Sequence, residues 1–315
     1  MLFNNIRKIY KYSKTFAINN HTNTLLTVLD CLCCKYIHGF SNREFFIGGG
    51  VNVRFFRRKN FVTYRRDLKI INTFNNKDYI HYFDNKVDFL TKFSKSINRD
   101  WFYCKAGEYF NYQEFIKKYN KIIRKPLNSW QGKGVTLLNK LDSEKEYNIL
   151  VENKVLLEEY IEQNSYMCFG NKSINTIRIF TVLDRSGQVH LIKSVLRAGV
   201  GDSLVDNFCA GGIVYSVDDE TGIIDSRGLD EFGNRYIYHP KTKICMLGFQ
   251  IPFWKEVVNL VKEAALIVPE VRWIGWDVAI STKGPLLVEA NHNPDQEFLE
   301  FFGNGFLYKE IMKFS

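Results

Sequence analysis

The stretch LLVEANHNPD, residues 286–295, joins a short apolar run to a carboxylate and, two positions later, to an amide. Residues i and i+2 of a strand share one face, so Glu289 and Asn291 should project together at the strand's end. Just upstream, IGWDVAIS (274–281) is a second apolar stretch with one acid, Asp277, and the intervening STKGP is typical of a hairpin turn. The pairing predicts three oxygen ligands at one sheet edge, a set that suits Mg²⁺.

A purely structural role for the same residues is the alternative. Acids are common at strand ends and Asn-Pro is common in turns, whereas magnesium has no compact sequence signature. On this stretch alone the structural explanation is favoured, so evidence for a magnesium site has to come from the rest of the chain.

The composition indicates a globular protein. The chain has 315 residues, of which 45% are hydrophobic and 15% aromatic, enough for two or three modest lobes with their own cores. It contains no apolar run of the length, about 18 residues, that a membrane-spanning helix needs, and its start lacks the pattern of a secretory signal. The odd number of cysteines, seven, fits reduced thiols. We expect a cytoplasmic protein, with peripheral attachment at a membrane as the alternative.

Basic charge is concentrated near the N-terminus. Residues 1–70 hold 13 Lys and Arg against three acids, or +10, while the whole chain carries +9, so the remaining 245 residues sum to −1. Such a region favours an anionic membrane surface or an acidic polymer as partner. FFRRKNFVTYRR (55–66) mixes aromatics with arginines as single-strand binders do, but its FVTY part also fits an ordinary strand, so we do not expect nucleic acid.

The order of helical and strand-like patterns predicts an α+β protein in three parts. A basic N-terminal region, residues 1–78, is helical at first and strand-like around GGGVNVRFFRRKNFVTY. A small lobe covers 79–160 and a large lobe 161–315. In the large lobe, NTIRIFTVLD, QVHLIKSVLRAG and GGIVYSVDDETGII predict an antiparallel meander, and WKEVVNLVKEAALIVP an amphipathic helix.

A glycine-containing loop follows the short strand predicted at KIIRKP, residues 121–126. IIRKPLNSWQGKGV places Lys125 at the strand's end and Gly132, Lys133 and Gly134 in the loop. Such a loop can direct backbone N–H groups and an ammonium at phosphate oxygens, although the spacing is not that of a Walker A loop. Further on, LLEEYI (156–161) could offer a strand edge that reads adenine through its backbone.

Taken together, this order of motifs resembles the ATP-grasp superfamily. The chain is similar to its sugar-transfer associated branch, whose members also carry an NK segment, here Asn85-Lys86, and an RDW element, here Arg99-Asp100-Trp101. The similarity covers roughly residues 25–300. It implies an ATP-grasp fold, in which two α+β lobes sandwich the nucleotide, with ATP and Mg²⁺ as cofactors.

The resemblance also implies roles for single residues. Two lysines would hold the phosphates, a glycine-containing cover would close over them, an acid would precede the hinge, the next three residues would contact adenine and ribose, and three ligands would bind magnesium, with Glu289 bridging two ions. In that order the residues are Lys86 and Lys125; Gly132, Lys133 and Gly134; Glu158; Glu159, Tyr160 and Ile161; and Asp277, Glu289 and Asn291.

Arg178 and Arg197 are candidate catalytic residues. Both lie on predicted strands, where a charge on an apolar segment should be paired or directed into a cleft. They could stabilise a transferring phosphoryl group. The alternative is a salt bridge on an exposed sheet face, which is equally favoured for Arg178 and less favoured for Arg197.

The function implied by the resemblance is ATP-dependent ligation of a carboxylate to an amine through an acyl phosphate. The acceptor would be a small molecule or glycan, such as a sugar or surface-polysaccharide precursor that receives an amino acid. The alternative enzyme is an ATP-dependent kinase that phosphorylates a sugar or small-molecule hydroxyl, since the motifs report nucleotide and metal and not the acceptor. A non-enzymatic basic binding module is the third reading.

Overall fold

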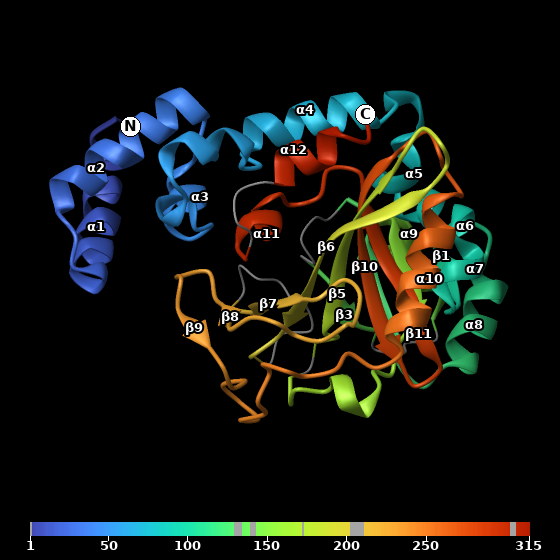
Figure 1. The fold of residues 1–315 in the computed structure, drawn as a ribbon. Coiled ribbons are helices and arrows are strands. Elements are labelled where there is room, and N and C mark those ends of the chain that lie inside the picture. The colour runs from blue at the N-terminus through green and yellow to red at the C-terminus, as the bar shows by residue number, and fades with distance from the viewer. Residues whose placement is uncertain (1, 129–133, 139–142, 172, 202–210, 303–306) are drawn as a thin grey trace.

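Two antiparallel sheets organise the chain in the computed structural model, which describes residues 2–128, 134–138, 143–171, 173–201, 211–302 and 307–315 (Figure 1). The small sheet has the order β1-β4-β2-β3 and the large sheet the order β11-β10-β5-β6-β7-β8-β9. The strands are β1 (Trp101–Tyr103), β2 (Ile122–Pro126), β3 (Thr136–Leu137), β4 (Val155–Glu159), β5 (Thr176–Leu183), β6 (Val189–Ala198), β7 (Ile213–Val217), β8 (Gly228–Leu229), β9 (Arg235–Tyr236), β10 (Trp273–Ser281) and β11 (Gly284–Asn291). The predicted α+β class and the β5–β6–β7 meander are confirmed.

The small sheet buries one face under two helices. These are α8 (Tyr109–Lys118) and α9 (Glu144–Glu152), which share a core with the side chains of Val155 and Leu157 from β4. Successive strand residues face opposite sides, so Leu156 and Glu158 point to the other face, toward the large lobe. The small sheet therefore presents its charged face to the space between the sheets.

The large sheet is covered completely on one face and partly on the other. The first face packs on α10 (Trp254–Ala265) and on α5 (His81–Asp84), α6 (Lys86–Lys92) and α7 (Ser94–Ile97). The second face packs on α4 (Tyr64–Phe74), α11 (Glu297–Glu300) and α12 (Leu307–Met312), and α4 and α12 lie side by side in Figure 1. Another part of this second face carries Arg178, Asp277 and Glu289, of which Arg178 and Asp277 are buried.

Residues 2–61 form a helical arm with its own small core of Ile9, Cys31, Cys34, Phe40, Phe45 and Phe61. The arm comprises α1 (Leu2–Asn20), α2 (Thr24–Cys33), a π-helix (Cys34–His38), α3 (Asn42–Phe46) and 3₁₀ turns at Gly50–Asn52 and Phe55–Asn60, and it projects from the sheets in Figure 1. Shorter 3₁₀ turns lie at Lys77–Tyr79 and Ser165–Met167. Within the described part of the chain, no helix has the length and hydropathy needed to cross a membrane.

The strand expected around GGGVNVRFFRRKNFVTY is wrong, because this stretch forms 3₁₀ turns. The cause is Arg58, which turns inward and is buried. Its guanidinium pairs with Asp30 at 2.5 Å and donates to the carbonyl oxygens of Val51 (3.3 Å) and Val53 (2.7 Å). A strand would leave these carbonyls to a neighbouring strand; here one arginine satisfies both. The division of the chain into three parts stays a prediction.

Candidate active site between the two sheets

The predicted oxygen ligands meet on the second face of the large sheet, the one that packs on α4, α11 and α12 elsewhere. Asp277 on β10 lies directly opposite Glu289 on β11, and Asn291 follows two residues later, opposite Gly275. The amide nitrogen of Asn291 lies 3.4 Å from Oε1 of Glu289. Strand alternation thus places the three side chains together, as the sequence indicated.

A bulge in β11 adjusts this arrangement. Asp277 pairs with Glu289, but the next residue, Val278, pairs with Leu287, so Val288 has no residue opposite it on β10. Leu287 turns into the core on the far face of the sheet, while Glu289 stays on the second face. Because of the extra residue, Leu287 and Glu289 lie on opposite faces of the sheet, one in the core and the other in the candidate site.

Both predicted arginines pair with Asp277. Arg178 on β5 is opposite it and donates from Nε (2.5 Å) and Nη2 (2.9 Å), and Arg197 on β6 approaches Oδ2 at 3.1 Å. Arg197 also donates to the hydroxyl of Thr176. The exposed-surface alternative is therefore wrong for Arg178, because Arg178 and Asp277 are both buried.

The pKa values of the two carboxylates are shifted in opposite directions. Burial alone would raise the pKa of Asp277, but the guanidinium groups of Arg178 and Arg197 hold it at about 2. Part of the Glu289 side chain is open to solvent, yet the surrounding protein, and then the negative charge of Asp277, raise its pKa. A cation between the two carboxylates would relieve that repulsion.

The donor set fits a magnesium ion that keeps further ligands. Carboxylate and amide oxygens are hard donors, and among the contacts that the structure describes Oδ1 of Asp277 accepts from one arginine nitrogen only, which leaves it a second acceptor position. Within the residues that the structure describes, no group of three or more His, Cys, Asp or Glu side chains is arranged to hold a metal. The remaining ligands would have to be water or substrate phosphates, as is usual for Mg²⁺.

The predicted lysines lie across from this pair. Lys125 on β2 contacts Oε1 of Glu158 at 2.8 Å, and Lys86 at the start of α6 donates to the carbonyl oxygens of Pro126 (3.2 Å) and Leu127 (3.1 Å). Burial lowers the pKa of Lys86, although the negative charge of Glu289 opposes the shift. The two ammonium groups thus mark a positive region beside two carboxylates.

Arg99 connects the two sheets, and the sequence did not single it out beyond the RDW element. Its Nε donates to Oε2 of Glu158 (2.6 Å) on the small sheet, while Nη1 and Nη2 donate to the carbonyls of Leu287 (2.5 Å) and Val288 (3.0 Å) on the large sheet. Consecutive carbonyls of a regular strand point in opposite directions, so one guanidinium can bind both only because β11 bulges there. The only available signal was a lone arginine before an aromatic strand.

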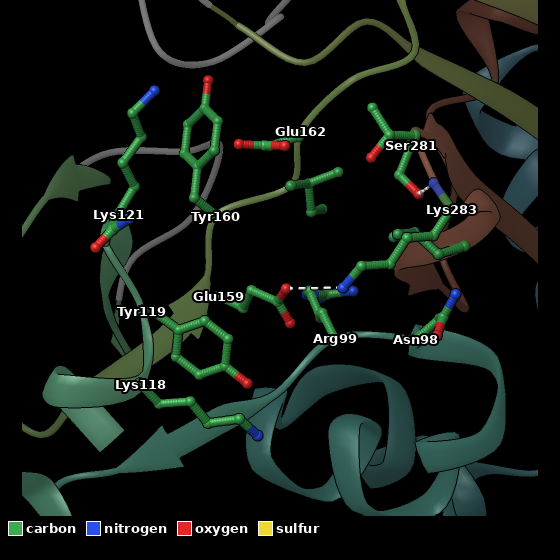
Figure 2. Close-up of a pocket in the computed structure, with 14 residues that line it drawn as sticks. Asn98, Arg99, Lys118, Tyr119, Lys121, Glu159, Tyr160, Glu162, Ser281 and Lys283 are labelled. Carbon is green, nitrogen blue, oxygen red and sulfur yellow. Dashed lines mark hydrogen bonds and ion pairs between the residues drawn. The ribbon is translucent and has the colours of Figure 1, made fainter. Parts of the chain in front are cut away.

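The predicted hinge residues line a cavity of about 380 Å³ beside this bridge (Figure 2). Glu159, Tyr160 and Ile161 form one wall, and Glu159 pairs with Lys283 from the β10–β11 turn at 3.1 Å. The ammonium of Lys121 lies 5.2 Å from the centre of the Tyr160 ring. Of the described residues, no predicted metal ligand lines this cavity, so hinge and metal site are separate ends of the space between the lobes.

The predicted phosphate cover is described in part. Gly132 and Lys133 lie outside the described residues. Gly134 has a φ of +76°, and a Cβ there would approach the Pro126 ring to 3.0 Å, so both backbone conformation and space favour glycine.

Comparison with known proteins gives one family match. The model of the family described as "Sugar-transfer associated ATP-grasp" matches residues 149–313, more than half of the chain. A search of curated protein sequences gave no significant match.

Among solved structures, the chain is similar to the ATP-grasp ligase PsnB complexed with a minimal precursor, Mg and ADP. The two are 13% identical with a TM-score of 0.47, over 76% of this chain and 61% of PsnB. N5-carboxyaminoimidazole synthetase from Staphylococcus aureus, complexed with ADP, is 10% identical with a TM-score of 0.44, over 72% of this chain and 52% of the synthetase. The chain thus spans less than two thirds of either protein.

Proposed function

Because the chain belongs to the sugar-transfer associated ATP-grasp family, we propose that it is an ATP- and Mg²⁺-dependent ligase that joins a carboxylate to an amine. An acceptor carboxylate would attack the γ-phosphorus of ATP, release ADP and form an acyl phosphate. An amine would then displace phosphate from the acyl carbon.

The observation that carries this proposal is the arrangement of charged side chains on the large sheet. Asp277 and Glu289 face each other on one sheet, with Arg178 and Arg197 bound to Asp277 and therefore near the place where phosphoryl charge would develop. Fixed positive groups at that place stabilise a phosphoryl transition state without reorganising.

Each group then has a distinct task. Lys86 and Lys125 would bind phosphate oxygens, with Lys125 exchanging its contact with Glu158 for the nucleotide. Glu159, Tyr160 and Ile161 would hold the base and ribose in the cavity at the hinge. Asp277, Glu289 and Asn291 would hold Mg²⁺, which when bound supplies positive charge to the β- and γ-phosphates. The chain's contribution is positioning and charge neutralisation.

We propose a sugar or surface-polysaccharide precursor as the acceptor and an amino acid as the amine. The support is the family description, which associates these proteins with sugar transfer. We also place the reaction in the cytoplasm, where ATP is available and the free thiols of Cys33, Cys168 and Cys245, which are exposed, would stay reduced.

The test is ATP consumption with Mg²⁺ over a panel of uronic acids, amino sugars and amino acids. ADP, free phosphate and product mass are followed together. We expect phosphate release that requires both a carboxylate and an amine, with a product heavier by their condensation. ADP formed without free phosphate, beside a phosphorylated acceptor, would identify a kinase and refute the ligase.

A further inference from the structure

One face of the helical arm is apolar, exposed and free of charged residues. The helix runs without interruption from α2 into the π-helix. Its buried side contains Thr27, Cys31 and Cys34. Its outer side carries residues spaced three or four apart, so that they share one face. We name this outer side the apolar face; its members are Leu25, Leu26, Leu29, Cys33, Tyr36 and Ile37.

The apolar face is too exposed to be part of the protein's core. Its leucines are between 57% and 68% exposed, and Tyr36 and Ile37 are 73% and 63% exposed. Isolated exposed leucines are ordinary, but five large apolar side chains on one helical face indicate a binding surface.

The arm that carries this face is rich in exposed cations. His38 at the end of the π-helix packs edge-on against Phe55, with ring centres 4.9 Å apart, so the 3₁₀ turn at Phe55–Asn60 is fixed against the same helix. That turn and its flank contribute exposed Arg54, Lys59 and Phe56, the last 84% exposed. In residues 1–70 the exposed basic side chains are Arg7, Lys11, Lys14, Arg54, Arg57, Lys59, Arg65 and Lys69.

The acids of this region do not offset that charge at the surface. Glu44 and Asp67 are buried. Asp30 is paired with Arg58 and only partly accessible. The described surface of residues 7–70 therefore offers cations and apolar groups without an exposed carboxylate.

We propose that the arm docks on an anionic lipid surface, with the apolar face lying in the plane of the membrane interface. Leu25, Leu26, Leu29 and Ile37 enter the acyl boundary, while Tyr36 and Phe56 lie at headgroup level and the exposed cations of the arm bind acidic headgroups. A second copy of the chain is disfavoured because it would bring two cationic surfaces together. Nucleic acid is disfavoured because aliphatic side chains do not stack on bases as aromatic ones do.

The test is cosedimentation of the full chain with vesicles of phosphatidylcholine containing about 30% phosphatidylserine, and with phosphatidylcholine alone. We expect binding that needs phosphatidylserine and weakens at least about tenfold as salt rises from roughly 0.1 to 0.5 M. Leu25→Ser with Leu29→Ser, and separately Arg54→Gln with Lys59→Gln, should each weaken binding about tenfold or more.

Matched variants in the large lobe control for composition. Leu247→Ser with Leu266→Ser removes two exposed leucines, and Lys255→Gln with Lys262→Gln removes two exposed lysines. These should bind vesicles as the unmodified protein does, and thermal unfolding should show all four proteins folded.

Several results would overturn the proposal. They are absence of vesicle binding, equal binding without phosphatidylserine, arm variants that bind like the controls, and binding of single-stranded RNA in place of vesicles. A dimer in sedimentation velocity that dissociates in the Leu25/Leu29 variant would assign the face to a second copy. None of these results depends on ATP turnover, so the proposed ligase stands or falls separately.

Discussion

Arg99 and Arg58 are two buried arginines that make similar bonds in different parts of the molecule. Each pairs with one carboxylate, at 2.6 Å for Glu158 and 2.5 Å for Asp30. Among the described residues, each also donates to backbone carbonyls, Arg99 to three and Arg58 to two. Arg58 bonds only within the arm, whereas Arg99 joins the small sheet to the large one. The comparison shows that a buried ion pair does not by itself distinguish a residue of the cleft from one of the arm. The distinction comes from which elements the arginine connects.

The largest expected effect is the same for both arginines. Arg99→Met and Arg58→Met each remove a buried cation that pairs with a carboxylate and donates to backbone carbonyls, so each should lower the free energy of unfolding by about 3–5 kcal/mol. Urea unfolding followed by circular dichroism measures this. A negligible loss in either variant would show that its acid finds another partner or water.

Substitutions in the cleft should reduce ATP turnover, whereas conservative substitutions in the arm should not. Glu289→Gln removes the carboxylate that faces Asp277 and should reduce turnover by about 10² or more, because the lost group acts on transition-state charge. Arg58→Lys, a conservative change in the arm, should leave turnover near the original rate. Turnover retained in Glu289→Gln would refute the assignment of the metal site.

A conservative change at Arg99 sharpens the comparison further. Arg99→Lys keeps the charge beside Glu158 but cannot hold both bulge carbonyls, so Glu289 should be less well placed. We expect the Mg²⁺-dependent gain in ADP affinity to fall about tenfold, with ADP affinity in EDTA little changed. Titration calorimetry on Arg99→Lys and Arg58→Lys gives both values. An equal gain in the two variants would show that the bridge is only structural.

The smallest effect concerns Asp67, a buried acid without a hydrogen-bond partner at Oδ1 among the described residues. Burial, and then the charges of Asp295 and Glu44, raise its pKa to about 8. A raised carboxyl pKa favours the folded state at low pH, and that contribution is lost as pH rises through the folded pKa. Asp67→Asn should therefore stabilise the protein by about 1 kcal/mol near pH 9 and not near pH 4, in urea unfolding at both values. A gain independent of pH would contradict this.

Local strand rules were sufficient to predict that Asp277, Glu289 and Asn291 lie together. The three residues converge because alternation and hairpin pairing act over a few residues. The meander was predictable for the same reason, since turn signals separate its strands.

Long-range contacts were not predictable. Arg99 lies 59 residues from Glu158 and 188 from Leu287, and Arg178 lies 99 from Asp277, so no local pattern reports these pairs. The strand predicted in the arm was wrong although its alternation of aromatic and basic residues is real. Arg58 turns inward and donates to backbone carbonyl oxygens that a neighbouring strand would otherwise have to pair. A buried pairing of this kind overrides propensity without leaving a periodic signal.

The bridge at Arg99 also defines a pivot. Because its guanidinium holds the bulge of β11 and the acid of β4 together, the lobes are joined at one end of the cleft. Points on the small lobe then move through arcs that lengthen with distance from the pivot, and β3, at the far edge of its sheet, should travel furthest. Labels on Thr136 and Lys262 would report that swing as a change in separation when nucleotide binds. The end of the cleft beside Arg99 would then act as the fulcrum, and the opposite end would open widest.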